Sequence, residues 1–139
     1  MTKPTVFLLL FLCSATTSMA DTLIVVNKEN ETTALTRGQI VDLYMGRYNT
    51  FPNNEAAFPL DQPADSEIRA EFYKKLTKKR VAEINAYWAR LLFSGRATPP
   101  RVLPDSSAVK KAVSMNKGAI GYIDSAELDE SVKVVGRVE

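Results

Sequence analysis

Residues 58–73, FPLDQPADSEIRAEFY, decide how the rest of the chain is arranged. This stretch predicts a short buried strand, a polar turn interrupted by Pro63, and a helix over residues 66–78. Three apolar residues recur at intervals of four along that helix: Ile68, Phe72 and Leu76. Because this spacing places them on one helical face, we expect the helix to pack against the strand that precedes it.

The start of this helix is a candidate anion site. Asp65 and Ser66 are both residue types that cap helices by accepting a hydrogen bond from a free backbone N–H group. A helix start has several such N–H groups without partners and carries a partial positive charge. We therefore expect any small anionic ligand of this chain to bind near Ser66.

The first twenty residues are typical of a secretory signal peptide. A short basic start at Lys3 precedes an apolar run over residues 6–12, and Ser18-Met19-Ala20 forms a small-x-small cleavage site. We expect cleavage after Ala20, export to the periplasm, and one domain over residues 21–139, which is 139 minus 20, or 119 residues. The apolar run is much shorter than the roughly 20 residues that span a bilayer.

Composition narrows the chemistry of this mature chain. Histidine is absent, and the only cysteine, Cys13, lies in the predicted signal peptide. Removing Lys3 from the 18 basic residues leaves 17 against 16 acidic ones, a net charge of +1. We therefore expect no metal site, no cofactor and no disulfide. The net charge argues neither for nor against nucleic acid, and we expect no nucleic-acid partner because the chain is predicted to be exported. An enzyme would depend on carboxylates, Lys, Tyr or Ser.

The remaining chain predicts alternating strands and helices. Strands are expected at 22–26, 119–123 and 131–135, and helices at 36–45, 81–93 and 106–115. Thr36 and Gln39 form the pattern of a capping box at the first of these helices. Asp105 or Ser106 starts the last one, which gives a second helix start with free N–H groups. The order predicts an α/β fold with a mixed sheet flanked by helices.

Two further features of the helices have alternative interpretations. Trp88 falls on the apolar stripe of its helix, so we expect it in the core rather than stacked on a ligand. A basic run occupies the end of the preceding helix: Lys74, Lys75, Lys78, Lys79 and Arg80. The run suits a solvated helix end, and the alternative is a surface that binds a polyanion.

Several fragments, in this order, resemble one family. The fragments are Leu35–Ile40, Tyr44–Arg47, Arg69–Phe72, Tyr87–Trp88, Phe93–Gly95, Pro99–Pro100 and Gly118–Tyr122. Together they resemble one domain of the type II periplasmic solute-binding proteins, specifically the substrate-binding proteins of phosphate ABC transporters. The resemblance covers about residues 22–123 and is closest to small single-domain exported members.

The resemblance implies a phosphate-binding loop ahead of the helix at 66–78. Full-length members hold phosphate in a cleft between two domains, with an arginine and, four residues later, a serine, a glycine and a threonine. Gln62 stands at the arginine position, Ser66 matches the serine, and Glu67 replaces the glycine. Arg69 either contacts the ligand or pairs with Glu67 or Asp65. The candidate ligand-binding residues are therefore Gln62, Ser66, Glu67, Arg69 and Ser106.

Three functions are compatible with the sequence. The first is an exported, non-catalytic binding module for phosphate or a related oxyanion, which takes part in ABC-type uptake or sensing and pairs with a second copy or another envelope protein. A variant of it lacks a ligand and acts as an adaptor for a membrane transporter or sensor, which the Gln62 and Glu67 departures favour. The other two are a hydrolase that uses Asp61, Asp65 or Glu67, and the polyanion binder.

Overall fold

The structure is a computed structural model that describes residue 2 and residues 21–139. Apart from residue 2, the predicted signal peptide lies outside the described residues. The strands are β1 (Thr22–Asn27), β2 (Phe58–Asp61), β3 (Arg101–Val102), β4 (Ala119–Asp124) and β5 (Val132–Val138). The helices are α1 (Arg37–Tyr44), α2 (Glu67–Thr77), α3 (Val81–Phe93), α4 (Ser106–Met115) and the short 3-10 turn η1 (Ser125–Glu127).

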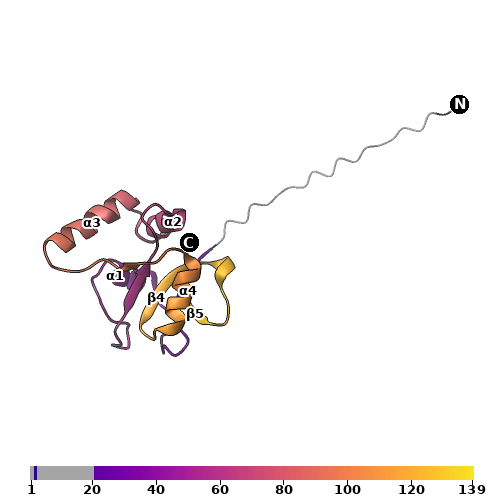
Figure 1. Cartoon of the computed structure of the whole chain (residues 1–139), viewed down its shortest axis with the longest axis horizontal. Helices are drawn as coiled ribbons and strands as arrows, with labels where there is room; N and C mark the ends of the chain where they lie inside the picture. Colours follow the sequence, from indigo (N-terminus) through magenta and orange to yellow (C-terminus); the bar gives the residue numbers. More distant parts are fainter. Residues whose placement is uncertain (1, 3–20) are drawn as a thin grey trace.

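The five strands form one mixed sheet in the order β3-β2-β4-β1-β5 (Figure 1). β2 runs parallel to both β3 and β4, whereas β1 runs antiparallel to both β4 and β5. The predicted mixed α/β sheet is therefore confirmed. All six residues of β1 are buried, as expected for an almost entirely apolar strand with neighbours on both sides.

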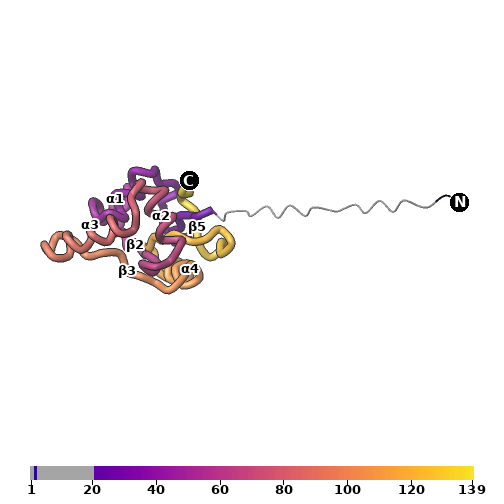
Figure 2. The backbone as a smooth tube through the Cα atoms, turned by 90° about the horizontal axis from the view of Figure 1, so that it is seen from above, coloured from indigo at the N-terminus to yellow at the C-terminus, as the bar shows by residue number. Residues whose placement is uncertain are grey.

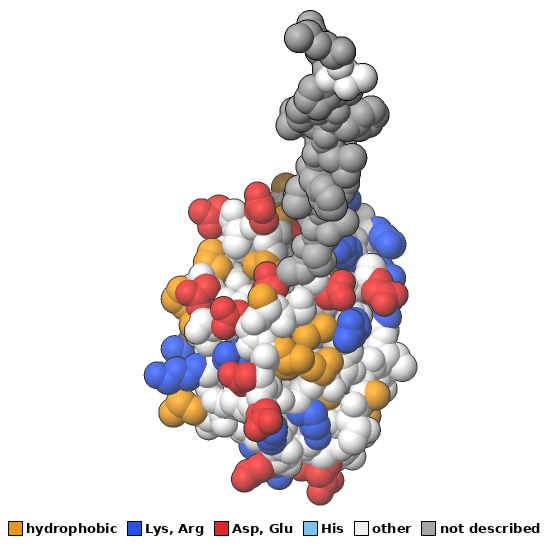
Figure 3. Space-filling model, turned by 90° about the vertical axis from the view of Figure 1, so that its right-hand side faces the viewer, with side chains coloured by type: hydrophobic (Ala, Val, Ile, Leu, Met, Phe, Trp, Pro, Cys, Tyr) orange, Lys and Arg blue, Asp and Glu red, His pale blue; other side chains and the backbone are white. Residues whose placement is uncertain are grey.

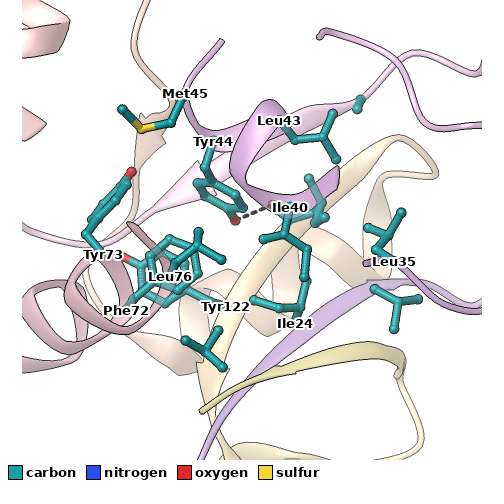
Figure 4. Packing of buried hydrophobic residues seen from close by; sticks show 14 of the residues in the cluster. Ile24, Leu35, Ile40, Leu43, Tyr44, Met45, Phe72, Tyr73, Leu76 and Tyr122 are labelled. Atoms are coloured by element: carbon teal, nitrogen blue, oxygen red, sulfur yellow. Dashed lines mark hydrogen bonds between the residues drawn. The ribbon is translucent and has the colours of Figure 1, made fainter. Parts of the chain in front are cut away.

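Helices cover both faces of the sheet (Figure 2). Because side chains alternate along a strand, Ile24 and Val26 of β1 face the helices α1, α2 and α3, and Leu23 and Val25 face α4. Tyr122 of β4 points to the first of these two cores. Figure 4 shows the larger core, where side chains of α1 and α2 meet those of the sheet.

The start of α1 follows the predicted capping box. The Thr36 hydroxyl accepts from the Gln39 amide at 3.2 Å, and the Gln39 side chain accepts from the Thr36 amide at 2.8 Å. Gly46 follows the end of the helix with a φ of +71°, a conformation that favours glycine. A Cβ atom there would lie 2.7 Å from the Trp88 ring, so the ring packs directly on this backbone.

On the opposite face, α4 lies close to β4 because Gly121 has no side chain. A Cβ atom at Gly121 would stand 2.3 Å from Cγ1 of Val109. Glycine at this position is therefore what permits the close backbone approach.

The structure corrects several sequence expectations. The two-residue strand β3 was not predicted, because exposed residues between prolines carry no apolar pattern. The last strand runs to Val138 rather than ending at Val135, since Gly136 pairs with Ile24 of β1. β2 begins at an exposed Phe58, so only its second half is buried. In α3, Leu92 is exposed, although its spacing of four from Trp88 is that of the apolar stripe.

Among the described residues, no helix combines the length and apolarity that a membrane crossing requires.

Candidate functional site

The candidate site lies at the edge of the sheet where the parallel strands β2, β3 and β4 end. Helix α2 starts six residues after β2 ends, and α4 starts four residues after β3 ends. Because the carboxyl ends of parallel strands share one edge, both helix starts come to this edge. In open α/β sheets this is the usual position of ligand sites.

Gln62 links the loop that precedes α2 to the start of α4 and to the end of β4. Its side chain is buried, and its Nε2 donates to the Ser106 hydroxyl at 3.2 Å and to the Tyr122 carbonyl at 2.9 Å. The Ser106 hydroxyl also accepts from the Asp124 amide at 3.1 Å, which ties α4 to the end of β4. Neither bond uses the hydrogen of that hydroxyl, so Ser106 can still donate to a ligand.

Ser66 lies at the N-cap position of α2, but its side chain does not cap the helix. Its hydroxyl donates instead to the Pro63 carbonyl at 2.6 Å. The expectation of a side-chain cap by Asp65 or Ser66 was therefore wrong, and no side chain in the described structure accepts from the first amides of α2. At α4 the cap is Asp105, which accepts from the Ala108 amide at 2.8 Å.

Asp61 is the centre of a buried polar cluster beneath this edge. Its Oδ2 accepts from the Tyr73 hydroxyl at 2.7 Å, and its Oδ1 accepts from the Tyr122 hydroxyl and from the backbone N–H of Gln62. Arg69 Nε lies 3.4 Å from Oδ1, and both side chains are less than 10% exposed. Arg69 thus pairs with Asp61 rather than with Glu67 or Asp65, the partners given as the alternative to a ligand contact.

The cluster changes the titration of its tyrosines. Burial, followed by the negative charge of Asp61, raises the pKa of Tyr73 and of Tyr122 well above the ordinary value. Tyr44, which donates to the Leu60 carbonyl, has a raised pKa for the same two reasons. All three hydroxyls therefore stay protonated and can donate across the physiological range.

Arg69 retains an unused donor. Its guanidinium lies over the Tyr73 ring, 5.0 Å from the centroid, and its Nη1 is buried with no hydrogen-bond partner among the described residues. Buried N–H groups are almost always paired. This atom is therefore a donor next to the start of α2 that a bound acceptor could satisfy.

The acidic residues of the hydrolase alternative lie in different environments. Asp61 is buried and ion-paired, whereas Asp65 and Glu67 are exposed. Glu67 occupies the first turn of α2, where its charge opposes an incoming anion. In the part of the chain that the structure describes, no three metal-ligating residues are grouped closely enough to hold a metal ion.

The sequence indicated part of this site. Gln62 and Ser106, both among the candidate ligand-binding residues, are brought together, whereas Glu67 is directed to solvent. The roles of Tyr73 and Tyr122 were missed. One signal was present: Arg69, Tyr73 and Leu76 are spaced by four and three, so a charged residue shared the buried face of α2. Such a residue requires a buried partner.

No family model matches the chain, and no curated protein matches its sequence. Solved structures match its fold. A candidate phosphate ABC transporter substrate-binding protein from Clostridium perfringens, determined with bound phosphate, is 22% identical over 84% of this chain, with a TM-score of 0.67. An ABC-type phosphate transport receptor from Vibrio cholerae is 23% identical over 84% of this chain, with a TM-score of 0.66.

The described chain therefore has the fold of one domain of the phosphate-binding type II periplasmic proteins. It spans only 44% and 45% of the length of those two proteins. The resemblance seen in the sequence is confirmed at the level of fold.

Proposed function

We propose that the chain is an exported, non-catalytic solute-binding module that binds a small oxyanion such as phosphate at the edge where β2 and β4 end. The observation that carries this proposal is the Gln62–Ser106 hydrogen bond, which ties the loop that leads into α2 to the start of α4. Free N–H groups of both helix starts, the Ser106 hydroxyl and Arg69 Nη1 supply donors for an oxyanion there. The solved structures that share this fold are named as phosphate transport proteins, which supports this ligand class.

One domain would cover only one side of a ligand bound at this edge, so tight binding needs a second protein surface. A small ligand is held tightly where most of its surface is buried, and one domain leaves an anion at this edge open to water. A second copy of the chain, or a membrane transporter or sensor protein of the envelope, would supply the other wall. The transport proteins among the structural neighbours support the transporter partner.

Thermal unfolding of residues 21–139 with and without phosphate tests this function. A ligand at about 100 times its Kd adds about 2.7 kcal/mol to the free energy of unfolding and raises the Tm by several degrees. We expect the shift to fall in Ser106→Ala and to persist in Ser107→Ala, an exposed residue of the same helical turn. The absence of a shift with phosphate and with related oxyanions would contradict the oxyanion site.

A ligand-free adaptor is the second candidate, and the internal hydrogen bonds of the site favour it. The side-chain amide of Gln62 and the Ser66 hydroxyl already form hydrogen bonds within the protein, and Asp61 already pairs with Arg69. In this case oxyanions leave the Tm unchanged. A photo-crosslinker placed at the exposed Glu67 should then capture a transporter or sensor protein in the envelope. The same crosslinker at Glu31, which follows β1 at the opposite edge of the sheet, is the control.

A further inference from the structure

A groove of about 780 Å³ lies at the opposite end of the parallel strands. Phe58 and Arg101, the first residues of β2 and β3, both line it, so we call it the amino-edge groove. Its other sides are the loop after α1 and the segment that returns from the end of α3 to the sheet (Figure 1). Its volume falls within the range of small-molecule sites, and its position separates it from the oxyanion site.

The groove has an apolar floor and an aromatic rim. Leu43 and Trp88 belong to the larger core, line the groove and are each less than 10% exposed, so they form the floor. Leu60 also lines the groove, but its side chain packs in the core on the α4 face of the sheet. Tyr48 and Phe58 line it with more than half of their surface exposed, which places them at the rim. Contact with this floor would remove apolar ligand surface from water.

The floor is held in place by contacts between α1 and α3. The Tyr87 hydroxyl donates to the Met45 carbonyl at 2.6 Å, and the Tyr87 ring meets the Trp88 ring edge to face. Trp88 in turn packs against Gly46. Because the ring is fixed from two sides, the floor is formed before any ligand arrives.

Three arginines line the groove, and none of its described lining residues is acidic. Arg47 has an exposed ion pair with Asp42 at 3.3 Å. Arg96 and Arg101 are exposed and have no ion pair among the described residues. The face of the molecule drawn in Figure 3 has a different charge pattern from the groove, because acidic and basic side chains are mixed on it. Guanidinium groups next to an apolar floor favour a carboxylate on an apolar body.

The Trp88 indole contains an enclosed nitrogen. Its Nε1 is buried and has no hydrogen-bond partner in the described structure. A buried N–H without an acceptor is rare, and it belongs here to the ring that forms the floor. Because this nitrogen has almost no accessible surface, the contacts proposed for a ligand do not include it.

From these observations we propose that the amino-edge groove binds an organic anion with an apolar body, such as a medium-chain carboxylate. The apolar body lies on Leu43 and Trp88, and the carboxylate meets Arg96 and Arg101. This site is independent of the oxyanion site, because no residue of the candidate oxyanion site lines it.

Trp88 is the only tryptophan of the chain, so its fluorescence reports directly on the groove. The test titrates residues 21–139 with octanoate, with octan-1-ol as the neutral counterpart and with inorganic phosphate as an anion without an apolar body. We expect a saturable change of Trp88 fluorescence with octanoate alone. Arg96→Gln combined with Arg101→Gln should weaken octanoate binding at least about tenfold, since charge-assisted contacts are lost. Arg90→Gln, an exposed arginine of α3 outside the groove, should leave it unchanged.

Three results would overturn the proposal. The first is a Trp88 signal that does not saturate with octanoate up to about 1 mM, because a Kd of about 1 mM corresponds to a binding free energy of only about 4 kcal/mol in magnitude. The second is equal binding of octan-1-ol, because the arginines would then play no part. The third is unchanged octanoate binding by the double arginine variant with an unchanged circular dichroism spectrum.

Discussion

Asp61 is a buried charge that four groups of the protein stabilise: the hydroxyls of Tyr73 and Tyr122, the backbone N–H of Gln62 and the Arg69 guanidinium. A buried carboxylate is tolerated only with such partners. The same four groups are donors of the kind that hold an external anion. Asp61 therefore acts as an internal anion beneath the edge where an oxyanion is proposed to bind.

Replacing Asp61 by Asn should strongly destabilise the fold. The change leaves the Arg69 guanidinium buried without its counter-charge, and loss of one partner of a buried ion pair costs about 3–5 kcal/mol. Urea unfolding of the two proteins measures the difference. Asp65→Asn, which changes an exposed carboxylate of the same loop, should stay within about 0.5 kcal/mol of the wild type. A cost below about 1 kcal/mol for Asp61→Asn would contradict the role of the pair.

The raised pKa of Tyr73 predicts a loss of stability in alkali. In the unfolded chain the hydroxyl titrates near 10.0, but in the folded protein its pKa is higher, because burial and Asp61 disfavour the anion. The unfolded state then binds fewer protons above pH 10, so the free energy of unfolding falls there by up to about 1.4 kcal/mol per pH unit for this group. Below that pH its stabilising contribution is fully present.

Tyr73→Phe tests this pH dependence. At neutral pH the variant should be less stable by about 1.5–3 kcal/mol, because it loses a hydrogen bond to a charged group. Above pH 10 the gap between wild type and variant should narrow, since only the wild type loses the contribution of this group. Tyr48→Phe, which removes an exposed hydroxyl, is the control. A gap that keeps its neutral value in alkaline urea titrations would rule out the proposed titration.

At the scale of elements, the start of α1 gives a matched test of local sequence signals. Thr36→Ala removes the cap of the Gln39 amide and should cost about 1 kcal/mol in urea unfolding. Thr33→Ala, an exposed threonine three residues earlier, should cost much less. Because Thr36 and Gln39 bond reciprocally, the double change with Gln39→Ala should cost less than the sum of the two single changes. Additive costs would show that the two bonds act independently.

Local sequence patterns predicted the helices more accurately than they predicted strand β3 or the candidate functional site. The capping box of α1 and the apolar period of α2 are each encoded within a few residues, and the structure has these helices where the patterns predicted them. β3 is specified by its neighbour β2 rather than by its own two exposed residues. The Asp61 cluster depends on Tyr122, which is 61 residues away in the sequence. Only the paired strands bring such residues together.

At the scale of the whole molecule, the parallel strands separate two chemically different ends. The carboxyl edge presents two helix starts and a buried, neutralised charge cluster. The amino edge presents arginines around an apolar floor. β2 has four residues, so its ends are only about 10 Å apart at roughly 3.3 Å per residue. Leu60 lines the groove, and the next residue, Asp61, belongs to the charge cluster at the other edge. The two sites therefore lie at opposite ends of the same short strand.

Because both cores of the fold are built on β1 and β4, residues 21–139 should unfold as one cooperative unit. Val113→Ala tests this from one side: Val113 of α4 is fully buried, and its truncation should cost about 2 kcal/mol. Trp88 lies in the other core, on the opposite face of the sheet. The variant should shift the urea midpoint seen by Trp88 fluorescence as much as the midpoint seen by far-UV circular dichroism. A fluorescence midpoint that stays at the wild-type value would mean that the α4 side unfolds separately, and the sheet would then not couple its two faces.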